Sequence, residues 1–157
     1  MSGDDLREPL VGWRIWRVTG SVLRATVWDA EWPPRARFEA DCRHGGGAYW
    51  QRKHEPADER HRPPEPGCEC GVYAFKRRED AEALAREKVD GDVIALGRVS
   101  LWGRVIETEL GYRAEYAHPY DLILLGGSDE LARRLRREYA VDVSTAPAVA
   151  PLHAGGG

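Results

Sequence analysis

The chain has 157 residues, with 23 basic against 26 acidic side chains and a formal net charge of −3. This length suits a single domain that buries its own apolar core. The near balance of charge argues against a protein that binds nucleic acid or anionic membranes through a general excess of positive charge.

The ends of the chain and its apolar runs indicate where the protein works. The first ten residues, MSGDDLREPL, are polar and acidic and do not resemble a secretory signal. The longest apolar run, LILL at 122–125, is far too short for a membrane span. We therefore expect a cytoplasmic protein without a membrane partner, in a compartment where thiols stay reduced.

The first third of the chain begins as strand and then loses its pattern. Residues 12–28, GWRIWRVTGSVLRATVW, predict two strands joined by a tight turn at Thr19-Gly20. Residues 29–67 lack periodicity and contain six prolines and the triplet Gly45-Gly46-Gly47. A structureless segment of this length is improbable inside a compact domain unless something other than a core orders it.

Regular patterns return at 71–76, GVYAFK, which predicts a strand. Apolar residues at helical spacing predict a helix over 77–89. Residues 93–117 predict two or three further strands, in which Gly97 and Gly103 mark bulges or corners.

The last third carries one more helix. An apolar segment at 120–125 precedes Ser128, the predicted N-cap of a helix that ends near Tyr139. Residues 141–143, VDV, suit a short last strand.

These elements predict an α+β fold, with a small, bent, mostly antiparallel sheet or open β-barrel and two helices. We expect one domain over residues 1–143, with a metal-stapled loop at about 40–71. Residues 144–157 consist largely of Ala, Pro and Gly, and we expect a disordered tail there.

All three cysteines of the chain and three of its histidines lie between residues 42 and 70, in the unpatterned segment or directly after it. Four nitrogen or sulfur ligands around Zn²⁺ supply the free energy that apolar burial cannot supply in such a loop. The predicted ligands of a structural zinc ion are Cys42, His61, Cys68 and Cys70. His61 is preferred because the proline-rich stretch between it and Cys68 restricts the unfolded chain. His54 is the substitute, and His44 is the less favoured alternative. Gly71 then allows the backbone to turn from the site into the next strand.

Other interpretations of the cysteines remain open at this stage. An iron–sulfur cluster is one, although it usually takes four thiolates. A redox pair of Cys68 and Cys70 is another, and a chance grouping of small buried side chains is a third. The spacing does not match the motifs of zinc deaminases or metalloproteases, and we find no catalytic constellation.

Aromatic and charged residues alternate along 111–119, GYRAEYAHP. One interpretation is a ligand cleft in which Trp102 and Tyr112 stack on a planar ligand while Arg113 hydrogen-bonds to it. The alternative is an ordinary half-buried strand with an Arg113–Glu115 pair on its solvent face.

Three segments in this order, HRPPEPGCECGVYAF, LWGRVIE and GYRAEYAHP, resemble a group of small bacterial proteins. That group shares a C-x-C-G-aliphatic-aromatic-Ala signature, a later L-W-G-x-V and a G-[YW]-R-A-E-x-A stretch. The resemblance covers roughly residues 12–125 and implies that the four predicted metal ligands belong together, but it carries over no catalytic residue. A looser similarity is to PUA-like barrels, some of which bind modified nucleic-acid bases.

The sequence therefore predicts a non-enzymatic, zinc-stabilised binding module. Its aromatic-lined cleft would take a small planar ligand, a nucleic-acid base or a peptide. The alternatives are a protein–protein adaptor that docks through residues 43–60 of the metal loop, a thiol-based redox or metal sensor, and an enzyme.

Overall fold

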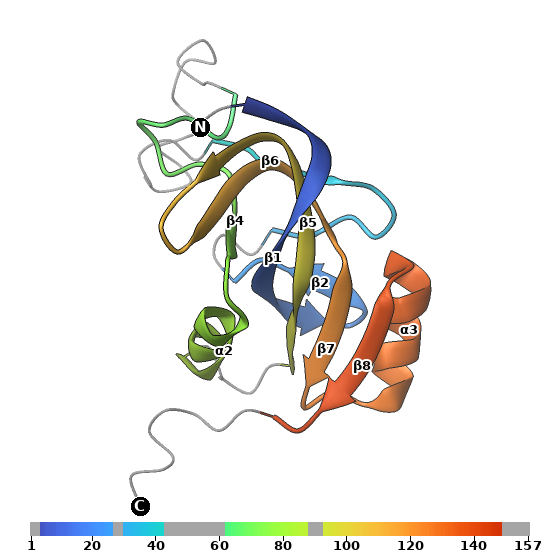
Figure 1. Ribbon diagram of the computed structural model, residues 1–157. Helices are drawn as coiled ribbons and strands as arrows, with labels where there is room; N and C mark the ends of the chain where they lie inside the picture. The colour runs from blue at the N-terminus through green and yellow to red at the C-terminus, as the bar shows by residue number, and fades with distance from the viewer. Residues whose placement is uncertain (1–3, 27–29, 43–61, 88–92, 149–157) are drawn as a thin grey trace, which may run out of the picture.

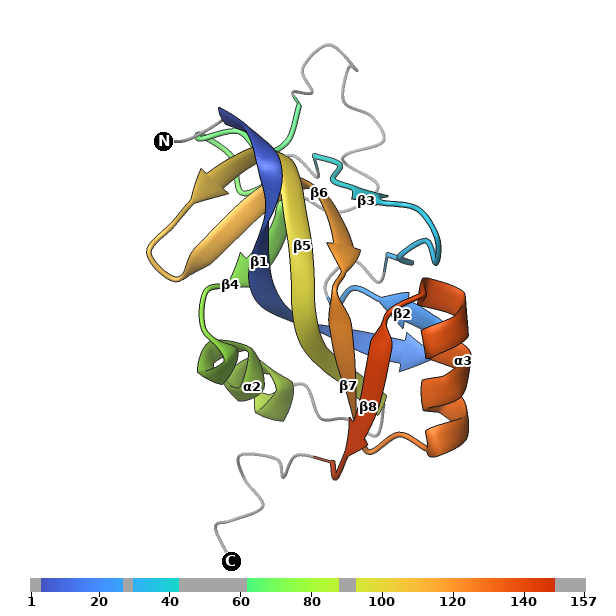
Figure 2. The same ribbon diagram turned by 45° about the vertical axis from the view of Figure 1, so that its right-hand side comes forward.

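The computed structural model describes residues 4–26, 30–42, 62–87 and 93–148, which form an α+β fold (Figures 1 and 2). In chain order the described elements are β1 (Asp4–Thr19), β2 (Val22–Arg24), β3 (Phe38–Glu39), β4 (Val72–Phe75), α2 (Arg78–Glu87), β5 (Val93–Glu107), β6 (Gly111–Pro119), β7 (Asp121–Leu125), α3 (Asp129–Tyr139) and β8 (Asp142–Ala146). The two helices lie apart from each other, α2 near the end of β4 and α3 alongside β8. The predicted fold class is confirmed.

All eight strands of the described ranges belong to one sheet, which closes in part on itself. The strand order is β2-β1-β4-β6-β5-β7-β8, with β3 attached to β6. Strand β1 also pairs with β5, and β4 pairs with β1 through Trp13 opposite Phe75. Strands β1, β4, β6 and β5 therefore form a small ring. Only β7 and β8 pair in parallel, and every other described pairing is antiparallel.

The two glycines singled out in β5 have different roles. Gly103 lies at the register shift between β5 and β6 and has φ of +79°, so it forms the predicted bulge. Gly97 pairs in regular register with Arg14 of β1. A Cβ at Gly97 would lie 2.0 Å from the carbonyl oxygen of Asp121, so this glycine permits a close backbone approach rather than a bulge.

Most buried apolar side chains belong to one core, and Tyr139 ties its outer parts together. This core includes Trp16, Leu23 and Leu101, none of which is more than marginally exposed. The buried hydroxyl of Tyr139 donates to the carbonyl oxygen of Trp32 at 2.7 Å and accepts from the amide of Leu23 at 2.9 Å. The end of α3 therefore fixes both β2 and the segment that carries Trp32. A second, smaller cluster lies beneath α2.

The described ends of the chain extend further into the sheet than predicted. Strand β1 begins at Asp4, because residues 4–6 pair with residues 103–105 of β5 on the far side of an irregularity between Leu6 and Leu10. Strand β8 continues to Ala146, opposite Leu125 of β7, so the predicted boundary at residue 143 is three residues too early. The apolar edge of β7 offers backbone partners that composition alone does not reveal. The rest of the predicted tail, from residue 149, lies outside the described residues.

Neither of the helices in the described ranges combines the length and the apolar character that crossing a membrane requires.

The bridge at Tyr139 gives a test of the packing. We expect Tyr139→Phe to lower the free energy of unfolding by about 1–3 kcal/mol, because the buried amide of Leu23 loses its acceptor. Urea titration followed by tryptophan fluorescence measures this change. Tyr120→Phe is the matched control, since Tyr120 is 51% exposed and its substitution should have little effect. Equal midpoints for the two variants would contradict the bridging role.

Candidate metal centre and the adjoining cavity

The three cysteine sulfurs converge at one point. All three Sγ atoms lie within 4.8 Å of one another, and those of Cys42 and Cys68 are 3.8 Å apart. None of the three forms a disulfide. Tetrahedral zinc with Zn–S bonds of about 2.3 Å places its sulfur ligands about 3.8 Å apart. The group therefore has the composition and the spacing to hold a metal ion.

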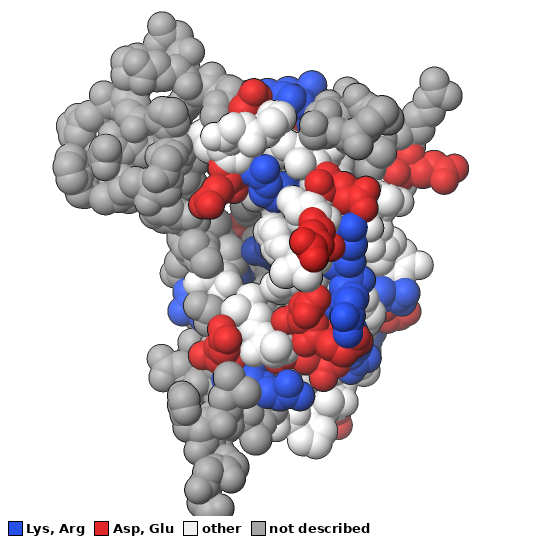
Figure 3. All heavy atoms as spheres, turned by 60° about the vertical axis from the view of Figure 1, so that its left-hand side comes forward, with Lys and Arg blue, Asp and Glu red and all other residues white. Residues whose placement is uncertain are grey.

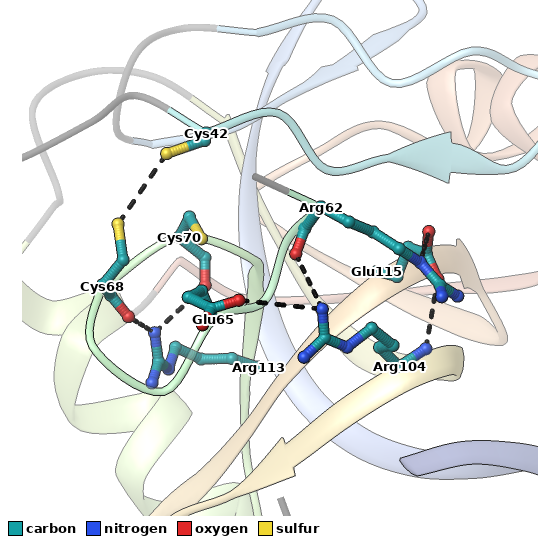
Figure 4. A network of polar contacts seen from close by, with 8 residues as sticks. All are labelled: Cys42, Arg62, Glu65, Cys68, Cys70, Arg104, Arg113 and Glu115. Atoms are coloured by element: carbon teal, nitrogen blue, oxygen red, sulfur yellow. Dashed lines mark hydrogen bonds and ion pairs between the residues drawn. The ribbon is translucent and has the colours of Figure 1, made fainter. Parts of the chain in front are cut away.

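The predicted histidine ligand lies outside the described residues, as do the two alternatives, His54 and His44. The assignment of His61 as the fourth ligand therefore stays a prediction. The residue that follows it, Arg62, is described and bonds to Glu115 and Arg104 in the network of Figure 4.

Two segments distant in sequence supply the thiols. Cys42 follows β3, and the other two cysteines lie in the turn that leads into β4. The turn begins with a hydrogen bond from the amide of Cys68 to the carbonyl oxygen of Glu65, at 3.0 Å. Gly71 then has φ of +113°, and a Cβ there would lie 3.0 Å from that of Pro64. Only glycine suits this position, in agreement with the predicted change of direction.

Arg113 of β6 supports this turn from below. Its Nη1 donates to the carbonyl oxygen of Cys68 and, at 3.2 Å, to that of Cys70 (Figure 4). The guanidinium therefore fixes the backbone on both sides of Glu69. Such contacts orient the residues that bear metal ligands.

Glu115, two residues further along β6, anchors the start of the same loop. It is buried, with 6% of its surface exposed, and accepts hydrogen bonds from both Nε and Nη2 of Arg62. Arg104 of β5 adds a backbone bond to Glu115 and a side-chain bond to the carbonyl oxygen of Arg62, each at 3.2 Å. The expected Arg113–Glu115 pair on a solvent face is therefore wrong. The bulge at Gly103 leaves room for the Glu115 carboxylate, where a Cβ would lie 2.7 Å from Oε1.

The pKa values of Glu115 and of the thiol of Cys70 are shifted in opposite directions. The hydrogen bonds from Arg62 lower the pKa of Glu115 below its ordinary value. Burial, followed by the neighbouring thiols, raises the pKa of Cys70 to about 12. A protonated Cys70 is a poor nucleophile, and a metal ion must displace its proton in order to bind.

A cavity of about 1200 Å³ adjoins the cysteine turn. Its wall is rich in aromatic residues, which are Trp13, Trp32, Phe38, Tyr73 and Phe75. Cys68, Cys70 and Arg113 also line it, together with Arg14 of β1. The surface shown in Figure 3 carries acidic and basic side chains intermixed, rather than one continuous basic patch.

The residues predicted to form a cleft do not all reach this cavity. Arg113 lines it, whereas Trp102 and Tyr112 are not among its lining residues. Trp102 lies beside Tyr116, with ring centroids 6.1 Å apart, and the ring of Tyr112 lies 5.7 Å from Nζ of Lys76. Tyr112 and Arg113 are consecutive in a strand, so their side chains leave opposite faces of the sheet. A joint ligand-binding role for these three stays a prediction.

Sequence reasoning did not find the residues that support the turn or line the cavity. No motif marks Arg14, Trp32, Arg62 or Glu115, and each acts through a partner far away in sequence. The abundance of tryptophan was the one signal of an aromatic cavity, and it did not indicate which rings line it.

No family model, curated protein or solved structure that was compared with the chain gave a match. The resemblance to the group of small bacterial proteins and to PUA-like barrels therefore stays a prediction, and function is argued from the site.

The anchor at Glu115 predicts a dependence on pH. Its pKa is lower in the folded than in the unfolded chain, so the ionised carboxylate stabilises the fold above about pH 4.3 and loses this effect as the pH falls through the folded pKa. We expect Glu115→Gln to lower the free energy of unfolding by about 1–3 kcal/mol at neutral pH, because Arg62 loses a charged partner. The difference from the unsubstituted protein should shrink below about pH 4.

Urea titrations at several pH values measure this difference. Glu107→Gln is the matched control, since its carboxylate also pairs with a cation but is 59% exposed. A deficit for Glu115→Gln that is the same at every pH would contradict the assignment.

Proposed function

We propose that the protein is a non-enzymatic binding module, stabilised by a zinc ion, whose aromatic-lined cavity takes a small planar ligand such as a nucleic-acid base. One observation carries the proposal: three thiols within 4.8 Å of one another lie beside a cavity of about 1200 Å³ that five aromatic residues line. A metal ion there would order the turn that forms one side of the cavity.

The ligand chemistry supports zinc. Thiolate and imidazole are the usual ligands of structural zinc, and the predicted set is Cys42, His61, Cys68 and Cys70. An iron–sulfur cluster usually needs four thiolates, and the chain contains three. Four protein ligands would leave no open position on the ion, which favours a structural role.

A thiol-based sensor is the second candidate. The 3.8 Å approach of Cys42 to Cys68 would suit reversible disulfide formation between them. The raised pKa of Cys70 opposes the predicted redox pair of Cys68 and Cys70, because reactive cysteines are those whose pKa is lowered. Residues 43–60, through which an adaptor would dock, lie outside the described residues.

Metal content tests the proposal directly. We expect the purified protein to contain one zinc ion per chain, and Cys68→Ser to lose it together with part of its thermal stability. Elemental analysis, a thiol count and Tm measure these outcomes. Glu69→Ala is the matched control, since Glu69 is exposed between the two cysteines of the turn. A folded protein that carries no metal, or one that gains a Cys42–Cys68 disulfide in mild oxidant, would favour the second candidate.

Arg113 offers an independent test through the backbone of the turn. We expect Arg113→Gln to keep all three thiols but to weaken zinc binding by about 10-fold or more, as loss of an outer contact to a metal site commonly does. Competition with a chromophoric chelator measures the affinity. Arg134→Gln, on the exposed face of α3, should bind zinc like the unsubstituted protein. Equal affinities for the two variants would remove Arg113 from the support of the site.

A further inference from the structure

We infer that the cavity beside the cysteine turn binds a planar anion, an aromatic ring that carries one carboxylate or phosphate group, and that Arg14 of β1 is the residue that recognises its charge. The inference rests on the proposed function for the presence of a ligand in the cavity. It adds the chemical class of that ligand and the residue that selects it.

Arg14 is a half-buried cation that has no carboxylate partner among the described residues. It lines the cavity from the middle of β1, opposite Gly97 of β5. Its Nη1 donates to the carbonyl oxygen of Tyr73 at 2.7 Å, but its Nε is buried and meets no acceptor within the described part of the chain. No acidic side chain of that part forms an ion pair with it.

Aromatic rings surround the guanidinium instead. Its central carbon lies 5.0 Å from the ring centroid of Trp32 and 5.9 Å from that of Trp16. These contacts stabilise a cation but supply no acceptor for its Nε. Burial lowers the pKa of Arg14 to about 10, so it remains charged at neutral pH in surroundings that disfavour the charge.

A second hydrogen-bond donor of the cavity lining also lacks an acceptor. The indole Nε1 of Trp32, which also lines the cavity, is buried and has no acceptor among the described residues. Buried donors without acceptors are rare in folded proteins and call for an explanation. The part-exposed guanidinium of Arg14 lines the cavity, and its shape matches the planar geometry of a carboxylate or phosphate. An oxyanion in the cavity would therefore give Arg14 the charged partner that the described residues do not supply.

The remaining lining sets the size and shape of the anion. Trp13, Phe38, Phe75 and Leu84 offer flat and apolar surface for a ring. The acidic residues Asp41, Glu65 and Glu69 also belong to the lining, and they would repel a second anionic group. The lining therefore favours a ligand with one anionic group over a nucleoside triphosphate or an oligonucleotide backbone.

Two matched pairs of probes test this inference on the zinc-loaded full chain. The pairs are indole-3-acetate with neutral indole-3-acetamide, and uridine 5′-monophosphate with neutral uridine. We expect the anion of at least one pair to bind about tenfold tighter than its neutral partner, measured by calorimetry and by the rise in Tm. The pair that shows the preference tells a carboxylate from a phosphate ligand.

Variants at Arg14 assign the effect. Arg14→Gln should bind the anion and its neutral partner equally. If the glutamine variant does not fold, Arg14→Lys is measured instead; it keeps the charge but loses the planar guanidinium, so its preference for the anion should be weaker. Arg134→Gln, on the exposed face of α3, should keep the full preference.

Each result decides the matter. Equal binding of both members of each pair would overturn the anion assignment and leave the binding module standing. A preference that survives in Arg14→Gln would overturn the role of this residue. If no probe binds at millimolar concentration, the ligand inference fails, whereas the zinc content bears separately on the proposed function.

Discussion

Two side chains on one face of β6 determine where the cysteine turn lies. Arg113 binds the carbonyl oxygens of Cys68 and Cys70, and Glu115 binds the side chain of Arg62 at the start of the same segment. Both contacts involve a charged group, and hydrogen bonds of that kind are stronger than neutral ones. A segment rich in proline is therefore attached to the sheet by polar contacts at both ends.

This attachment also relates the thiols to the cavity. The turn carries two of the three sulfurs and lines the cavity with the same few residues. Elsewhere in the lining, Trp32 is positioned through its carbonyl oxygen by Tyr139 of α3. One part of the cavity lining, the cysteine turn, would be made more rigid by a metal ion, and another part, Trp32, is already held by α3. Such a division suits a site whose shape must persist before its ligand arrives.

Local patterns predicted most of the fold. Alternation and β-branched residues located the strands, helical spacing located α2, and Ser128 does cap α3 by accepting from the amide of Leu131. Each of these signals depends on residues that are close together in the chain, so they can be recognised in a single sequence. The meeting of Cys42 with the two cysteines 26 and 28 positions later was also predictable, because little else could order that segment.

The parts that escaped prediction depend on contacts between distant residues. Glu115 looked like a solvent-facing member of an alternating strand, and its partner Arg62 lies 53 positions away. Arg14 looked like one of many arginines until the structure placed it against Trp32. The alternation of a strand states which residues share a face, but it does not state what covers that face.

The pairing of β1 with β5 has a consequence for how the protein is made. It joins residues between 75 and 101 positions apart, from Val18 with Val93 to Asp4 with Val105. Folding slows as contacts become more distant along the chain, because the intervening loop must close first. During synthesis, β1 therefore leaves the ribosome long before the strand that covers its edge, and all three cysteines emerge in the interval.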